Sequence, residues 1–115
     1  MTTPILAKNE VLERVDGDIQ FLTDLTQDFL DSFPSQFAEL SAAAESCDAH
    51  ETEHKAHSLK GALRNLGGLK SGATAHKIEL AAKQGDISTA KQMLSELKSD
   101  VKEFENEFKA FLSTV

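Results

Sequence analysis

Tryptophan and tyrosine are absent from this 115-residue chain, which has a single cysteine and only two prolines. The lone Cys47 excludes an intrachain disulfide, and no apolar run approaches the ~18 residues of a membrane-spanning helix. The first residues also lack the charged and apolar regions of a signal peptide. We therefore expect one cytoplasmic, monomeric domain over residues 1–115 that does not associate with a membrane.

Basic residues are scarce, since 12 Lys and Arg stand against 19 Asp and Glu and give a formal net charge of −7. A nucleic-acid surface needs clustered positive charge to neutralise phosphates, so this balance argues against nucleic-acid binding. The aromatic residues are seven phenylalanines, and the core is therefore expected to consist of Leu, Phe and Ala.

What the chain does contain is apolar residues at helical spacing, and no stretch alternates as a strand would. A short amphipathic segment over 5–15 precedes a longer one over 19–44, whose phase continues across Pro34. Since proline interrupts the helical hydrogen-bond ladder, we expect either one kinked helix or two helices in register there. Further helices are predicted over 48–66, 69–84 and 86–115.

Turn and capping signals separate these segments. Asp48 begins a capping-box-like pattern, the helix that follows it stops at Gly67 and Gly68, and the next helix stops at Gly85. Asp86 is predicted to cap one long last helix. Amphipathic helices joined by short turns predict an all-α fold, an antiparallel four-helix bundle with a short N-terminal helix.

The helix over 48–66 has an unusual polar face. On a helical wheel its apolar stripe consists of Leu59, Ala62, Leu63 and Leu66. The residues roughly opposite that stripe are His57, Lys60, Gly61 and Arg64. A glycine inside a helix costs roughly 1 kcal/mol relative to alanine, so Gly61 is expected to serve something other than helix stability. Steric clearance over His57 is one explanation, and a close helix–helix contact is the other.

An exposed imidazole near two cations describes a nucleophile beside an anion site. Phosphoryl transfer fits this chemistry, because it needs an unprotonated ring nitrogen, positive charge for the phosphoryl oxygens and room for in-line approach. Lysine is a suitable point charge for phosphate. The ordinary alternative is a solvated histidine without a role.

His57, Lys60, Gly61 and the turn glycine Gly67 resemble the signature of the histidine-containing phosphotransfer (HPt) domains of bacterial and fungal two-component phosphorelays. The resemblance spans nearly the whole chain, including "RVDGDIQFLTDLTQDFL" before the motif and "GD" after the helix over 69–84. The family places a Glu or Gln on the following helix, against the histidine ring, and Glu79 is the matching position here.

The resemblance implies that the Glu79 carboxylate accepts a hydrogen bond from Nδ1–H of His57 and leaves Nε2 pointing outward as the nucleophile. That role requires one of two possible faces of the helix over 69–84 to be buried. The buried face would be Ser71, Ala75, Ile78 and Ala82, and the other face is Leu69, Ala73 and Leu80.

The resemblance also implies a shuttle. A receiver domain's phospho-aspartate gives its phosphoryl group to His57, and a second receiver's aspartate later takes it. The implied partners are receiver domains of response regulators and hybrid histidine kinases, which supply Mg²⁺. The chain itself would need no cofactor and would have no autonomous kinase activity. Lys60 would stabilise the phosphoryl charge, Gly61 would give the receiver access, and Arg64 would add a cation for binding.

Docking in this family surrounds the active histidine. By position, Leu12, Val15 and Phe21 are candidates for apolar contacts with a receiver, or else they belong to the core. A phosphotransfer domain of a chemotaxis-type kinase is the close relative that the sequence leaves open.

Three other interpretations compete with a phosphotransfer protein. Cys47, His50, His54 and His57 have helical spacing suited to metal ligands, but residues strung along three turns of one helix cannot all reach one ion. An autonomous kinase would need a nucleotide site, but the segment "GGLKSG" lacks the spacing of a phosphate loop and has no preceding strand. A purely structural bundle would have no need of the histidine signature. His76 is assigned no role.

Overall fold

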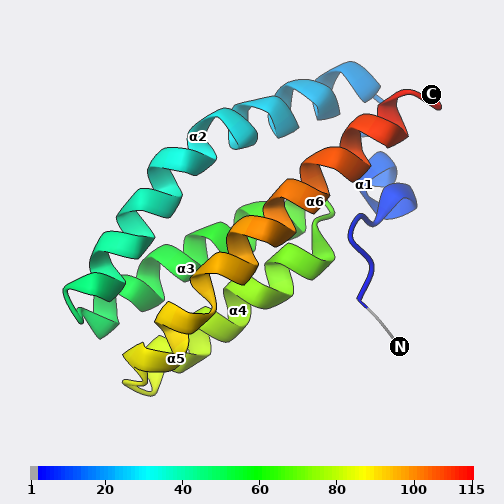
Figure 1. The fold of residues 1–115 in the computed structure, drawn as a ribbon. Coiled ribbons are helices and arrows are strands. Elements are labelled where there is room, and N and C mark those ends of the chain that lie inside the picture. Colours follow the sequence, from blue (N-terminus) through cyan, green and yellow to red (C-terminus); the bar gives the residue numbers. More distant parts are fainter. Residues whose placement is uncertain (1–2) are drawn as a thin grey trace.

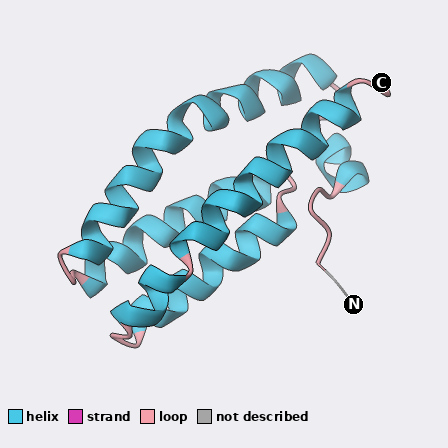
Figure 2. Cartoon of the chain, viewed as in Figure 1, coloured by secondary structure: helices cyan, strands magenta, loops and turns pink. Residues whose placement is uncertain are grey.

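The computed structural model describes residues 3–115, and this part of the chain contains helices, turns and loops but no strand (Figure 2). Its helices are α1 (Lys8–Arg14), α2 (Ile19–Glu45), α3 (Ala49–Asn65), α4 (Leu69–Lys83), α5 (Ile87–Gln92) and α6 (Leu94–Leu112). The long helices α2, α3, α4 and α6 form an antiparallel bundle, and α1 lies at one end of it (Figure 1). The predicted all-α four-helix bundle with a short N-terminal helix is confirmed.

Helix α2 continues without a break across Pro34. Figure 1 shows that this helix is bent along its length, as expected where a proline removes a ladder hydrogen bond. Of the two alternatives offered by the sequence, one continuous, bent helix is therefore the correct one.

The turn between α3 and α4 is built as its glycines predict. Gly67 has a φ of +81°, which favours glycine because it has no Cβ. The Gly68 N–H donates to the Leu63 carbonyl at 2.8 Å, and the Gly67 N–H donates to the Arg64 carbonyl at 3.1 Å. At the start of α3, the Asp48 side chain accepts from the Glu51 N–H at 3.0 Å, which confirms the predicted cap.

One predicted element is wrong in detail. Asp86 caps only the short helix α5, accepting from the Thr89 N–H at 3.1 Å, and a turn at Met93 separates α5 from α6. The Met93 N–H is shared between the carbonyls of Thr89 and Ala90, each at 3.2 Å, which tightens the chain locally. Because of this turn, α5 closes the end of the bundle while α6 runs back along α4 (Figure 1).

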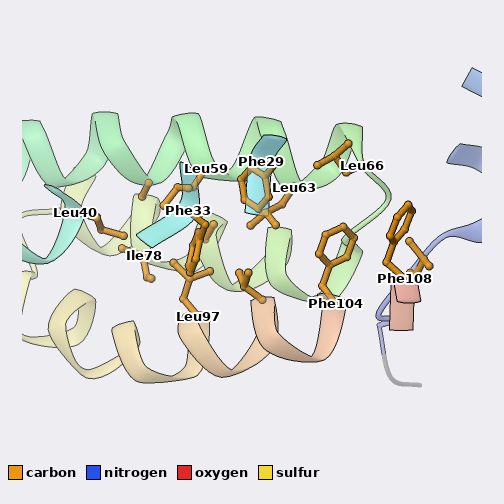
Figure 3. Close-up of a cluster of buried hydrophobic side chains, with 14 of the residues drawn as sticks. Phe29, Phe33, Leu40, Leu59, Leu63, Leu66, Ile78, Leu97, Phe104 and Phe108 are labelled. Atoms are coloured by element: carbon orange, nitrogen blue, oxygen red, sulfur yellow. The ribbon is translucent and has the colours of Figure 1, made fainter. Parts of the chain in front are cut away.

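The core lies between the four long helices, where phenylalanine and leucine side chains converge (Figure 3). Helix α4 buries the face predicted for it, namely Ser71, Ala75, Ile78 and Ala82. On the opposite face, Leu80 remains 42% exposed. This orientation matters for function because it turns the neighbouring Glu79 toward α3. No helix in the described range is both long enough and apolar enough to span a bilayer.

Candidate functional site

His57 lies in the middle of the exposed face of α3 and contacts α4 through one ring nitrogen. Its Nδ1 is 2.7 Å from Oε2 of Glu79, and its side chain is 62% exposed while that of Glu79 is 13% exposed. A carboxylate only accepts hydrogen bonds, so this contact requires the proton on Nδ1. The neutral ring then carries its lone pair on Nε2.

The Glu79 carboxylate is held by three donors. Besides His57, Lys60 Nζ lies 2.7 Å and His76 Nδ1 3.4 Å from Oε1 of Glu79. Burial raises the pKa of this carboxyl, but hydrogen bonds from Lys60, His57 and His76 outweigh it and lower the pKa from 4.5 to about 2. Glu79 is therefore ionised at neutral pH and can balance positive charge on the His57 ring.

The contact of His76 was not anticipated from the sequence. His76 and Glu79 are three residues apart on α4, a spacing that places two side chains on the same helix face. This spacing is the signal that could have found the contact, but it is common and carries little information alone.

Lys60 does lie at the site, but on the side of Glu79. Its side chain is only 15% exposed, and its ammonium group contacts the carboxylate. In this structure Lys60 therefore fixes the group that orients His57. Its predicted role in stabilising phosphoryl charge stays a prediction.

Gly61 and Arg64 continue the exposed face toward the C-terminal end of α3. A Cβ added at Gly61 would meet no atom within 4 Å, so no helix–helix contact requires a glycine there. The predicted role of Gly61 in giving a receiver access to His57 stays a prediction. The Arg64 side chain lies over α4, where a Cβ added at Gly72 would be 3.0 Å from Arg64 Cγ.

A shallow hollow of about 290 Å³ lies beside His57 and is lined by His50, Glu53, His54, His57 and Glu79. Cys47 is exposed in the turn before α3, at a φ of +57°. Within residues 3–115, no group of three or more His, Cys, Asp or Glu side chains is placed to hold a metal ion.

The candidate docking residues differ in exposure. Phe21 is 51% exposed near the start of α2, and Leu25, one turn later, is 40% exposed. Leu12 and Val15 are partly buried and pack against the core cluster. Only Phe21 of the three predicted residues thus presents a large apolar surface to solvent.

A comparison with protein families matches residues 24–107 of this chain to the Hpt domain. Among solved structures, the chain is similar to histidine-containing phosphotransfer protein B from Pseudomonas aeruginosa PAO1. The two share 22% sequence identity with a TM-score of 0.84 over 99% of each chain, a similarity that supports the fold. A search of curated proteins found no significant match.

Because the family match covers most of the chain, the protein belongs to the Hpt domain family. It is a histidine phosphotransfer protein of phosphorelays, as the signature around His57 predicts. Proteins of this family act as phosphotransfer intermediates and interact with receiver domains.

Proposed function

We propose that Nε2 of His57 is the atom that carries the phosphoryl group. The observation that carries this proposal is the 2.7 Å contact between Nδ1 of His57 and Glu79 on a ring that is 62% exposed. One nitrogen is occupied on the protein side, and the other is left as a nucleophile that a partner can approach.

The transfer step follows from this arrangement. Nε2 attacks the phosphorus of a receiver's phospho-aspartate, the Nε2–P bond forms as the P–O bond to aspartate breaks, and the aspartate carboxylate leaves. The Nδ1 proton stays in place, so the phosphorylated ring is an imidazolium whose charge the ionised Glu79 balances. The reverse sequence passes the phosphoryl group to a second receiver.

The neighbouring residues have supporting roles in this proposal. Lys60 anchors Glu79 and adds positive charge near the phosphoryl group. Gly61 leaves open space for the receiver, and Arg64 offers a cation two turns along the same face of α3.

The partners in this proposal are the receiver domains of response regulators and hybrid histidine kinases. The receiver supplies Mg²⁺, and the chain needs no cofactor of its own and has no autonomous kinase activity. We further propose that residues 1–115 act as one cytoplasmic, monomeric domain. The net charge of −7 fits a protein that binds neither nucleic acid nor anionic membrane.

Transfer from receivers tests the proposal. The protein would be incubated with a panel of phosphorylated receiver domains and Mg²⁺, and acid-labile phosphate would be measured on the wild type and on His57→Gln. We expect label on the wild type alone. Equal labelling of His57→Gln would rule out His57 as the acceptor. Light scattering on the same sample checks the expected monomer mass of 12.5 kDa.

A further inference from the structure

The direction in which Nε2 of His57 points can be derived from helix geometry. Glu79 on α4 holds Nδ1 on one side of the ring. Because helix residues are about 100° apart, Glu53 and Lys60 lie on the α4 side of His57, at about 40° and 60° around α3. His54 and Gly61 lie on the opposite side, at about 60° and 40°. Nε2 is at the ring tip, away from Nδ1, and therefore faces the side of His54 and Gly61.

The contact of Lys60 with Glu79 agrees with this assignment of the two sides of His57. Lys60 Nζ lies 2.7 Å from Oε1 of Glu79, so the side that includes Lys60 does face α4. The Lys60 ammonium group is thus engaged by Glu79 on the Nδ1 side of the ring, from which it contributes charge to the site. A phosphoryl group on Nε2 would lie on the other side.

On that side of α3, His54 is the histidine one turn before His57, whereas His50 lies two turns before it. Side chains of an α-helix lean toward its N-terminus, so the His57 ring lies over the preceding turn, which contains His54. Gly61, in the following turn, has no side chain and meets only open space. His54 and His57 also line the same hollow of about 290 Å³.

We propose that His54 is a phosphoryl-binding residue whose ring N–H donates a hydrogen bond to a phosphoryl oxygen carried on Nε2 of His57. This inference rests on the proposed function, because it requires the phosphoryl group on His57. A neutral imidazole has one N–H and an imidazolium has two, so a donor is present in either state. The carboxylates of Glu53 and Glu79 border the same hollow and repel an anion, which makes a donor at this point important.

Phosphoramidate tests this inference without a partner protein. Its P–N bond breaks as the Nε2–P bond forms, and ammonia leaves. The second-order rate constant for labelling and the ³¹P chemical shift of the product would be measured for wild type, His54→Ala, His54→Gln, His50→Ala and His57→Gln. EDTA in every sample removes metal ions from the surface histidines, and circular dichroism checks the helical fold.

We expect His54→Ala to lower the rate constant about three- to tenfold, the net effect of one ordinary hydrogen bond at a solvent-exposed position. His54→Gln keeps an N–H donor and should recover most of the rate and the wild-type ³¹P shift. His50→Ala removes a histidine one turn further from His57, so its rate constant and ³¹P shift should equal those of the wild type.

The outcomes separate the inference from the function on which it rests. A rate and a ³¹P shift for His54→Ala equal to those of His50→Ala would overturn the role of His54 and leave His57 as the acceptor. A slower His54→Ala with no recovery in His54→Gln and no change in ³¹P shift would also overturn it. An unlabelled wild type, or a labelled His57→Gln, would contradict the proposed function and the inference together.

Discussion

At the level of single residues, the proposed role of Gly61 sets helix stability against access to His57. It lies inside α3 with open space around its Cβ position, so alanine fits there without a clash. We expect Gly61→Ala to raise the free energy of unfolding by about 0.5–1 kcal/mol, since alanine is the better helix former. Phosphotransfer from a receiver should become slower, because the added methyl group lies next to the approach path.

Urea unfolding and transfer rates measured on the same Gly61→Ala preparation check both halves of this prediction. A variant that is more stable and transfers as fast as the wild type would show that Gly61 does not serve receiver access.

Glu79 links the site to the stability of the fold through its pKa, which is lowered from 4.5 to about 2 in the folded protein. A carboxyl whose folded-state pKa is below its unfolded value stabilises the fold above the unfolded value, and this contribution is lost as the pH falls. The loss should therefore occur between pH 4.5 and about 2.

Urea unfolding of the wild type and Glu79→Gln at about pH 6 and about pH 3 measures this effect. The difference in free energy of unfolding between the two proteins should be larger at the higher pH. An unchanged difference would mean that the hydrogen bonds to Glu79 do not persist in solution.

At the level of elements, the turn between α3 and α4 fixes how His57 meets Glu79. Gly67 has a φ of +81°, and a Cβ added there would lie 3.3 Å from atoms of Leu6, Ala7 and Val11. At Gly85 the φ is +79°, but nothing lies within 4 Å. Gly85→Ala should cost about 1–2 kcal/mol from backbone strain alone, and Gly67→Ala should cost more.

The comparison of these two variants by urea unfolding isolates the packing of the N-terminal segment on the turn. Equal losses of stability would mean that the N-terminal segment moves aside for the added methyl group with no loss of free energy of unfolding. In that case the hydrogen bond from the Ala7 N–H to the Gly67 carbonyl, at 2.8 Å, would contribute little to the fold.

Local signals in the sequence predict the elements well. The cap at Asp48, the turn at Gly67 and the buried face of α4 depend on short-range chemistry that the residues themselves reveal. The turn at Met93 was missed because apolar spacing continues through it, and only packing against the other helices redirects the chain.

The candidate site likewise combines features that the sequence predicts with features that only the packing of the helices determines. The pairing of His57 with Glu79 follows from the family signature, and the structure brings the two together. The contact of His76 with Glu79 is an i, i+3 pair within α4, a spacing too common to single it out. The contact of Lys60 with Glu79 depends on side-chain directions across two helices. So does Arg14, which donates to the carbonyls of Arg64 and Asn65 at 2.8 Å each and ties α1 to the end of α3. No spacing in the sequence specifies the contacts of Lys60 and Arg14.

At the level of the whole molecule, two phenylalanines allow stability and recognition to be tested separately. Phe104 is fully buried in the core, and Phe104→Ala should lower the free energy of unfolding by about 3–5 kcal/mol. Phe21 is 51% exposed, so Phe21→Ala should change stability by no more than about 0.5 kcal/mol.

Urea unfolding checks both values, and binding of a receiver domain gives a second measurement on Phe21→Ala. Weaker binding by this well-folded variant would assign Phe21 to the docking surface. Unchanged binding would remove it from that surface.

The contact between Nδ1 of His57 and Glu79 also has a chemical consequence for the product. Phosphohistidine exists as two positional isomers, one for each ring nitrogen, and here the fold blocks one of them before any partner arrives. Under the proposed function, the bundle therefore fixes the regiochemistry of the phosphoryl group on His57, and every molecule in a phosphorylated population should hold the τ isomer alone.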